Sequence, residues 1–170
     1  MPNWVMNLVR VNSDTAEELQ NFKKQIQSPE ENKLFDFNKI IPMPKEIAEA
    51  NDCSWYTWAI KNWGTKWNAN EVEIAQESDT YMEYNFLTAW SLPYPIYKKL
   101  WEMFPRIRFE VIFAEENDSE LSGMLTFCRE DHIWEEYWSE NEEDSTDFFI
   151  QCWGFDPNVE QEEEDNDSNE

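Results

Sequence analysis

Trp63-Gly64-Thr65-Lys66-Trp67-Asn68 organises the middle of this chain, because its six residues hold two of the ten tryptophans and one of the three glycines. The residues before it repeat at helical spacing and predict a helix capped by Ser54, with Trp55, Trp58, Ala59 and Asn62 in it. Glycine adopts the left-handed conformation that commonly ends a helix, so Gly64 is predicted to end this one. Trp63 and Trp67 are then expected to hold the helix against a sheet, with Thr65 and Lys66 hydrogen-bonding the turn.

Apolar periodicity on either side of this stretch predicts alternating strands and helices. A helix of about residues 14–27 follows the first strand, with Asn12, Ser13 or Asp14 as its N-cap and Glu17 or Glu18 closing a capping box. The predicted strands are Trp4–Val11, a hairpin of 71–75 with 81–90, a strand over 107–113 and a further one at 124–130. Another helix is predicted to begin at Pro95 and to stop at Pro105.

The order of these elements predicts an α+β fold. Without the residues from about 30 to 70, which form a helical, Trp-rich insertion after the first helix, the order is βαββαβ plus one extra C-terminal strand. That order is the ferredoxin-like split unit, in which helices cover one face of an antiparallel sheet. We therefore expect a ferredoxin-like domain over residues 1–130.

The last forty residues differ from this domain in composition. Trp134, Tyr137 and Trp138 lie at helical spacing and predict a short helix, and Phe148–Trp153 predicts a last packed segment. Residues 131–156 are thus expected to form an acidic, aromatic extension packed on the domain. Beyond Pro157 only Val159 is apolar, so residues 157–170 are predicted to form a disordered acidic tail.

The net charge of −24 is concentrated at the C-terminal end of the chain. Residues 115–170 hold 21 of the 37 acidic residues and one of the 13 basic residues, for a net charge of −20. Residues 1–114 carry a net charge of only −4. Such a surface repels nucleic acid and anionic lipid, so a macromolecular partner is expected to be basic.

Several classes of chemistry are excluded by what the sequence lacks. Its three glycines are far apart, so neither a P-loop nor a dinucleotide-binding motif is present. His132 is the single histidine and is expected to be structural, and the three widely spaced cysteines indicate reduced thiols. No apolar run or leader pattern predicts a membrane span or a signal peptide. We therefore expect a cytoplasmic protein that is not an enzyme, with no cofactor, no metal and no membrane partner.

Four phrases of the sequence together resemble the YubB/Api92-like family. They are Asn3-Trp4 with Asn7, Lys39-Ile40-Ile41-Pro42-Met43-Pro44, Trp63-Gly64-Thr65-Lys66-Trp67, and Thr88-Ala89-Trp90-Ser91 before Pro93. The resemblance covers about residues 1–130 and implies a ferredoxin-like fold and an origin on plasmids, phages or prophages. It implies no activity and no catalytic residues. On this view the acidic extension from about residue 131 is this chain's own departure.

Two interpretations of the acidity remain open. In the first, the protein inhibits a host defence nuclease or restriction or CRISPR complex by mimicking DNA. A domain of this length is about 40 Å across, and duplex DNA of that length carries about 23 charges. Residues 115–156 carry a net charge of −13, about half as many. The expected contact residues are Glu135, Glu136, Glu140, Glu142, Glu143, Asp144 and Asp147, with Trp134, Tyr137 and Trp138 anchoring their helix. In the second, the protein is a generic interaction module of a mobile element, and its acidity serves only solubility.

The Trp63–Asn68 turn also has two interpretations. It is predicted first as a structural element that joins the insertion to the sheet. The alternative is a secondary binding turn made by Trp63, Thr65, Lys66 and Trp67, where exposed indole rings stack on a ligand. The sequence leaves this choice and the oligomeric state open.

Overall fold

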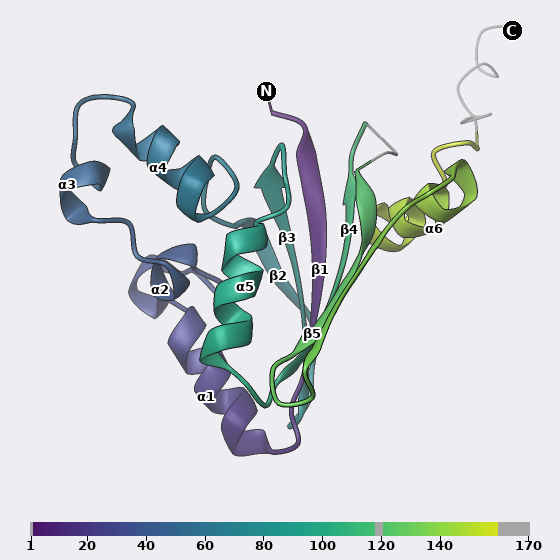
Figure 1. Cartoon of the computed structure of the whole chain (residues 1–170), viewed down its shortest axis with the longest axis horizontal. Coiled ribbons are helices and arrows are strands. Elements are labelled where there is room, and N and C mark those ends of the chain that lie inside the picture. The colour runs from purple at the N-terminus through teal and green to yellow at the C-terminus, as the bar shows by residue number, and fades with distance from the viewer. Residues whose placement is uncertain (1, 118–120, 160–170) are drawn as a thin grey trace, which may run out of the picture.

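A six-stranded antiparallel sheet in the order β2-β3-β1-β4-β5-β6 forms the centre of the structure (Figure 1). The structure is a computed structural model that describes residues 2–117 and 121–159. Its strands are β1 Trp4–Asn12, β2 Asn70–Glu77, β3 Tyr81–Ala89, β4 Arg108–Glu115, β5 Ser122–Cys128 and β6 Ile133–Trp138. β1 lies between β3 and β4 and pairs with both along its length.

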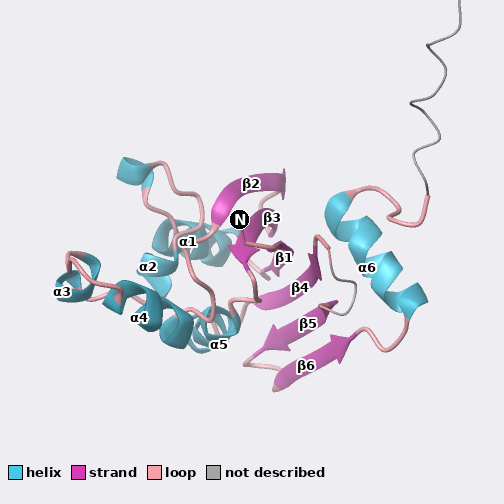
Figure 2. Ribbon diagram, turned by 90° about the horizontal axis from the view of Figure 1, so that it is seen from above, coloured by secondary structure: helices cyan, strands magenta, loops and turns pink. Residues whose placement is uncertain are grey.

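The helices divide unequally between the two faces of the sheet (Figure 2). Those that precede β4 lie on one side, and the C-terminal helix alone lies on the other. They are α1 Ala16–Ile26, the 3-10 helix η1 Pro29–Glu31, α2 Phe37–Ile40, α3 Lys45–Ala48, α4 Ser54–Asn62, α5 Tyr94–Met103 and α6 Glu142–Trp153. We call the two sides the α1/α5 face and the α6 face.

The α1/α5 face holds the main core, which consists largely of aromatic rings. Phe22 of α1 is completely buried, and its ring centroid lies 4.9 Å from that of Phe104 and 5.6 Å from that of Phe109, both edge-on. Edge-to-face packing of this kind stabilises aromatic pairs beyond the effect of the buried area alone. The helical spacing of Leu19, Phe22 and Ile26 therefore does what the sequence predicts and binds α1 to the sheet.

The α6 face holds a second and smaller core. Leu8 of β1 and Ile112 and Ala114 of β4 are buried there beneath Phe149 and Cys152 of α6. The indole Nε1–H of Trp153 donates a hydrogen bond to the Ala114 carbonyl oxygen at 3.2 Å. β4 is consequently buried on both faces at its C-terminal end.

The predicted α+β order is confirmed. β1, α1, β2, β3, α5 and β4 form the βαββαβ unit, and η1, α2, α3 and α4 occupy the predicted insertion between α1 and β2. β5 is the predicted extra strand and adds to the sheet beside β4. Among the described residues, no helix has the length and apolar character needed to cross a membrane.

The expected short helix at Trp134–Trp138 is wrong, because these residues form β6. Trp134 pairs with Phe127 of β5, and Trp138 pairs with Gly123. Aromatic and β-branched side chains favour strands, and three aromatic residues spaced i, i+3, i+4 are too few to distinguish the two periods. A helix does follow, but it is α6, so the expectation that helices cover only one face is also wrong.

Smaller corrections concern the ends of elements. Thr15, not one of residues 12–14, caps α1, and its Oγ1 accepts a hydrogen bond from the Glu18 N–H at 3.3 Å. Cys53, not Ser54, precedes α4 as its N-cap. Of the predicted tail, residues 157–159 are described and form a turn in which Asn158 donates to Thr146 Oγ1 at 3.2 Å. The rest of the predicted tail, residues 160–170, lies outside the described residues.

Candidate functional site

The turn after α4 begins with a glycine that the fold requires. Gly64 has φ +79°, and its N–H donates a hydrogen bond to the Ala59 carbonyl oxygen at 3.2 Å. A Cβ atom at this position would lie 2.7 Å from Pro95 Cδ and 3.3 Å from the Leu92 carbonyl oxygen. Both the left-handed backbone and the close approach of α5 therefore need glycine. The prediction that Gly64 ends the helix is confirmed.

Two neighbours of Gly64 hold the insertion to the rest of the fold. Thr65 is fully buried, and its Oγ1 donates to the Ala89 carbonyl oxygen of β3 at 2.8 Å. The Trp63 indole is 4% exposed and donates to the Ile41 carbonyl oxygen at 2.8 Å. Trp63 and Thr65 are thus structural in this arrangement, as the first interpretation of the turn predicts.

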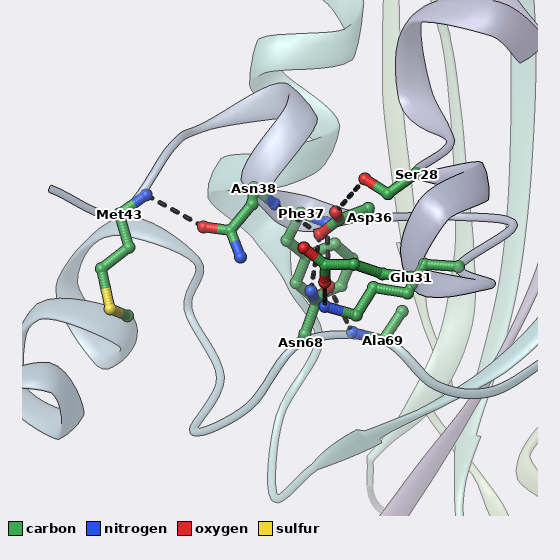
Figure 3. Close-up of polar contacts among 9 residues, drawn as sticks. Ser28, Glu31, Asp36, Phe37, Asn38, Met43, Asn68 and Ala69 are labelled. Carbon is green, nitrogen blue, oxygen red and sulfur yellow. Dashed lines mark hydrogen bonds and ion pairs between the residues drawn. The ribbon is translucent and has the colours of Figure 1, made fainter. Parts of the chain in front are cut away.

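Asn68 completes the anchoring through a buried carboxylate (Figure 3). Asn68 Nδ2 donates to Asp36 Oδ1 at 2.6 Å, and Asn68 Oδ1 accepts the Phe37 N–H at 2.8 Å. Asp36 also accepts from Ser28 Oγ at 2.5 Å and from the Asn38 N–H at 2.9 Å. Burial alone raises the pKa of Asp36, but these hydrogen bonds favour the ionised form and lower its pKa overall.

Lys66 and Trp67 behave differently, because the fold leaves them at the surface. Lys66 was expected to hydrogen-bond the turn, but among the described residues its ammonium makes neither a hydrogen bond nor an ion pair and lies over aromatic rings instead. Lys66 Nζ is 4.4 Å from the ring centroid of Trp67, 4.9 Å from that of Trp90 and 5.9 Å from that of Tyr56. All three rings are well exposed, at 37% for Tyr56 and Trp67 and 44% for Trp90.

The backbone of Trp90 is held in an unusual conformation. Its φ is +67°, in the left-handed region that bulky residues rarely adopt, at a cost of about 1–3 kcal/mol. Its N–H donates to the Asn3 carbonyl oxygen at 2.9 Å, which fixes the residue just after β3 ends. Trp90 was predicted as the last residue of that strand, but the strand ends at Ala89 and the Trp90 ring is exposed.

The predicted acidic contact residues do not share one helix. Glu135 and Glu136 are neighbours on β6, so their side chains point to opposite faces of the sheet. The Glu136 carboxylate lies on the α1/α5 face, where it accepts hydrogen bonds from the Tyr94 hydroxyl and from the Trp134 indole. These two bonds lower its pKa. Glu140 lies in the connection between β6 and α6.

The Asp144 carboxylate is engaged in hydrogen bonds with its neighbours. Its Oδ2 accepts from the Tyr137 hydroxyl at 2.5 Å and from Asn141 Nδ2 at 2.9 Å. Asn141 is the N-cap of α6 and accepts the Asp144 N–H at 3.0 Å. Acidic residues in a first helical turn are stabilised by the helix dipole. This role at the start of α6 explains Asp144 without a role in partner binding.

Glu142, Glu143 and Asp147 do come together at the start of α6. They line an open surface hollow of about 610 Å³ with Asn141, Thr146 and Asn158. Glu142 also lines a neighbouring hollow of about 200 Å³, together with Glu116 and Phe149. Within the described residues none of these four carboxylates has an ion-pair partner. We call Glu116, Glu142, Glu143 and Asp147 the α6 acidic surface.

Glu116 was missed by sequence reasoning because it lies directly after β4, far from α6 in the chain. It accepts the Trp4 N–H at 2.9 Å and is thereby held at the same end of the sheet as the start of α6. The sequence signal for Glu116 was its place in the acidic region from residue 115 onward, between the predicted strands at 107–113 and 124–130. Contacts between separate elements of this kind depend on where α6 docks, which no local pattern encodes.

The described residues show no cluster of three or more His, Cys, Asp or Glu side chains suited to a metal ion. Burial raises the pKa of the Cys152 thiol to about 12, so it stays protonated and unreactive at neutral pH. His132 lies exposed in the turn between β5 and β6 at φ +56°. The arrangement therefore offers two features for binding, namely the α6 acidic surface and the exposed aromatic rings around Lys66.

Comparison with known proteins identifies the fold. A family model described as the ferredoxin-like domain in Api92-like protein matches residues 62–156. The chain belongs to this family. The match runs through β6 and α6, so the C-terminal extension is part of the matched domain and not a departure peculiar to this chain.

One solved structure, protein api92 from Yersinia pseudotuberculosis, is similar with a TM-score of 0.50 and 16% sequence identity. The similarity covers 62% of this chain and 40% of that protein, and at this identity it shows the fold alone. A comparison with curated proteins finds no match. The family description names a fold and no catalytic activity.

Proposed function

We propose that this member of the Api92-like family is a non-enzymatic binding protein that docks on a basic, nucleic-acid-handling protein through its α6 acidic surface. The observation that carries the proposal is the group of carboxylates of Glu116, Glu142, Glu143 and Asp147, for which the described part of the chain supplies no ion-pair partner. In the described part of residues 115–159 the one basic side chain is Arg129. Its guanidinium packs on the Trp101 ring and bonds the Glu102 carbonyl oxygen, so it balances none of them.

The size of this surface limits how much of a DNA duplex it can imitate. α6 has twelve residues and is about 18 Å long, a length over which duplex DNA carries about 11 charges. Four carboxylates therefore imitate a short patch of a nucleic-acid backbone and not a whole duplex face. Such a surface competes for part of a basic groove, and its binding weakens as salt screens the charges.

The class of partner follows from the mobile-element origin that the sequence resemblance implies. A basic groove that handles nucleic acid in a host cell is the feature shared by defence nucleases, restriction enzymes and CRISPR complexes. We therefore propose inhibition of such a host defence protein as the biological role, in the host cytoplasm. Direct binding of nucleic acid is disfavoured by the net charge of −24.

A capture experiment with matched variants tests the proposal. The immobilised full chain is expected to retain a nucleic-acid-binding protein at about 50 mM salt, to release it by about 500 mM, and to lose it to added duplex DNA. The variant Glu142→Gln/Glu143→Gln/Asp147→Asn should lose capture.

The control Glu17→Gln/Glu30→Gln/Glu46→Gln removes the same charge from exposed positions away from α6 and should keep capture. Equal loss of capture in both variants would show that only total charge matters. Retention in 500 mM salt would point to apolar docking. Either result would contradict the proposal.

A further inference from the structure

The rings of Tyr56, Trp67 and Trp90 surround the ammonium group of Lys66. They come from three separate segments, namely α4, the turn that follows it and the residue after β3. The ammonium nitrogen lies within 6 Å of all three ring centroids, which is the range of a cation–π interaction. We call these three rings the aromatic cage.

The cage holds its cation by rings alone. Among the described residues no carboxylate pairs with Lys66. The contrast is Lys98, whose ammonium lies 5.2 Å from the Tyr94 ring and 5.6 Å from the Trp134 ring. There the Glu136 carboxylate is hydrogen-bonded to both of those aromatic side chains and balances the charge. Within residues 2–117 and 121–159 the Lys66 cage has no such counter-charge, so its cation is open to exchange.

Structural need accounts for only part of the cage, through the contact of Trp67 with Trp4. Within the Trp63–Asn68 turn, the side chains of Trp63, Thr65 and Asn68 each make a hydrogen bond that holds the insertion in place. Trp67 and Trp90 are instead among the most exposed large side chains of the protein. Trp90 also keeps its outward ring at a positive φ. A backbone outlier of this kind is more common at binding sites than elsewhere.

We propose that the aromatic cage is a binding site for an organic cation, an alkylammonium or guanidinium group of another molecule, and that Lys66 occupies it in the free protein. Aromatic cages are the usual means of recognising such groups, because the ring faces attract a weakly hydrated cation. Lys66 reaches the cage on a flexible stem and swings out when a second cation enters. In the free protein, the Lys66 ammonium group therefore competes with any other cation for the aromatic cage.

The cage lies at the same end of the sheet as the α6 acidic surface. Trp67 packs against Trp4 with ring centroids 5.9 Å apart, and the Trp4 N–H bonds Glu116 at 2.9 Å. A basic partner seated on the acidic surface is therefore positioned to place an arginine or lysine in the cage. This identification of the cation as a partner's side chain rests on the proposed function, whereas the cage itself does not.

Titration with tetramethylammonium chloride, followed by the indole N–H signals in two-dimensional NMR, tests the cage directly. The signals of Trp67 and Trp90 are expected to shift more than in sodium chloride of equal ionic strength. The Lys66→Met variant keeps the stem and removes the competing charge, so it should bind the cation about fivefold more tightly. N-acetyl-arginine amide and N-acetyl-lysine amide then compare the two side-chain cations.

Two variants separate binding from stability. Trp90→Gly should abolish the shifts without lowering the melting temperature, because glycine suits the left-handed backbone there. Should that chain fail to fold, Tyr56→Leu removes an exposed ring from α4 and should weaken binding. The triple variant of α6 should leave cation binding unchanged, so failure of the acidic surface and failure of the cage give different results. Indole shifts no larger than those in sodium chloride, in both wild type and Lys66→Met, would overturn the proposal.

Discussion

The two faces of the sheet differ in what covers them and in what they leave exposed. The α1/α5 face is covered by several helices and buries a continuous cluster of aromatic rings. The α6 face is covered by one helix over a handful of buried side chains, and that helix carries carboxylates on its solvent side. Stability should therefore depend mainly on the first face and partner binding on the second, so that mutations separate the two.

The largest effect is expected from Phe22→Ala on the α1/α5 face. Phe22 is fully buried, and its ring packs edge-on against Tyr84, Phe104 and Phe109. Loss of the ring and the resulting cavity should lower the free energy of unfolding by about 3–5 kcal/mol. Urea denaturation followed by circular dichroism measures this. A loss below about 1 kcal/mol would mean that this face does not dominate stability.

A smaller effect is expected from Phe149→Ala on the α6 face. Its ring is 6% exposed, and it lies over a thinner core that can partly close around the gap. We expect a loss of about 2 kcal/mol in the free energy of unfolding, less than for Phe22→Ala. Hydrogen exchange should show α6 amides exposed while those of α1 stay protected. Equal hydrogen exchange in both helices would show that the two faces unfold together, which would contradict the proposed difference between them.

The buried carboxylate of Asp36 should make the α1/α5 side sensitive to acid. Its folded pKa is lowered below the unfolded value of about 3.9, so its stabilisation is present above that pH and is lost as the pH falls through the folded pKa. Asp36→Asn should cost about 1–2 kcal/mol at pH 7 and reduce the slope of stability against pH below about pH 4. Denaturation curves at a series of acid pH values test this, with Asp79→Asn, an exposed carboxylate in the turn between β2 and β3, as the control. An unchanged slope in Asp36→Asn would contradict the assignment.

The smallest effect on stability is expected from neutralising the α6 acidic surface. Glu142→Gln/Glu143→Gln/Asp147→Asn removes no buried contact, but it removes charges that favour the start of the helix. We expect a net change within about 0.5 kcal/mol in the free energy of unfolding. Thermal denaturation at low and high salt measures this change. A loss comparable to that of Phe149→Ala would mean that the carboxylates are structural and not a free surface.

Much of the α1/α5 face could be predicted from the sequence, because its signals are local. Leu19, Phe22 and Ile26 repeat at helical spacing, and Gly64 marks the end of α4 by its conformational freedom. The coverage of the second face was not predicted, although Ile112 and Ala114 alternate with Val111 and Phe113 in an unbroken apolar run. Such a run is typical of a strand buried on both faces.

The candidate sites were harder to predict, because they are made by contacts between distant segments. The segment that forms β6 was predicted as a helix, which wrongly placed Glu136 on the same surface as Glu135 and the residues of α6. Glu116 joins that surface only because of where α6 docks. Similarly, Lys66 and Trp67 were considered as part of a binding turn, but Tyr56 and Trp90 complete the cage from other elements. Periodicity identifies elements and not their neighbours.

The most direct test of the account is the salt dependence of partner affinity for the wild type and the two triple variants. The affinity of the captured partner is measured by calorimetry between about 50 and 500 mM salt. The account predicts a steep loss with salt for the wild type and for Glu17→Gln/Glu30→Gln/Glu46→Gln, and a weak, nearly flat dependence for Glu142→Gln/Glu143→Gln/Asp147→Asn. The same steep slope in all three proteins would contradict it, because the α6 acidic surface would then not be the surface that binds.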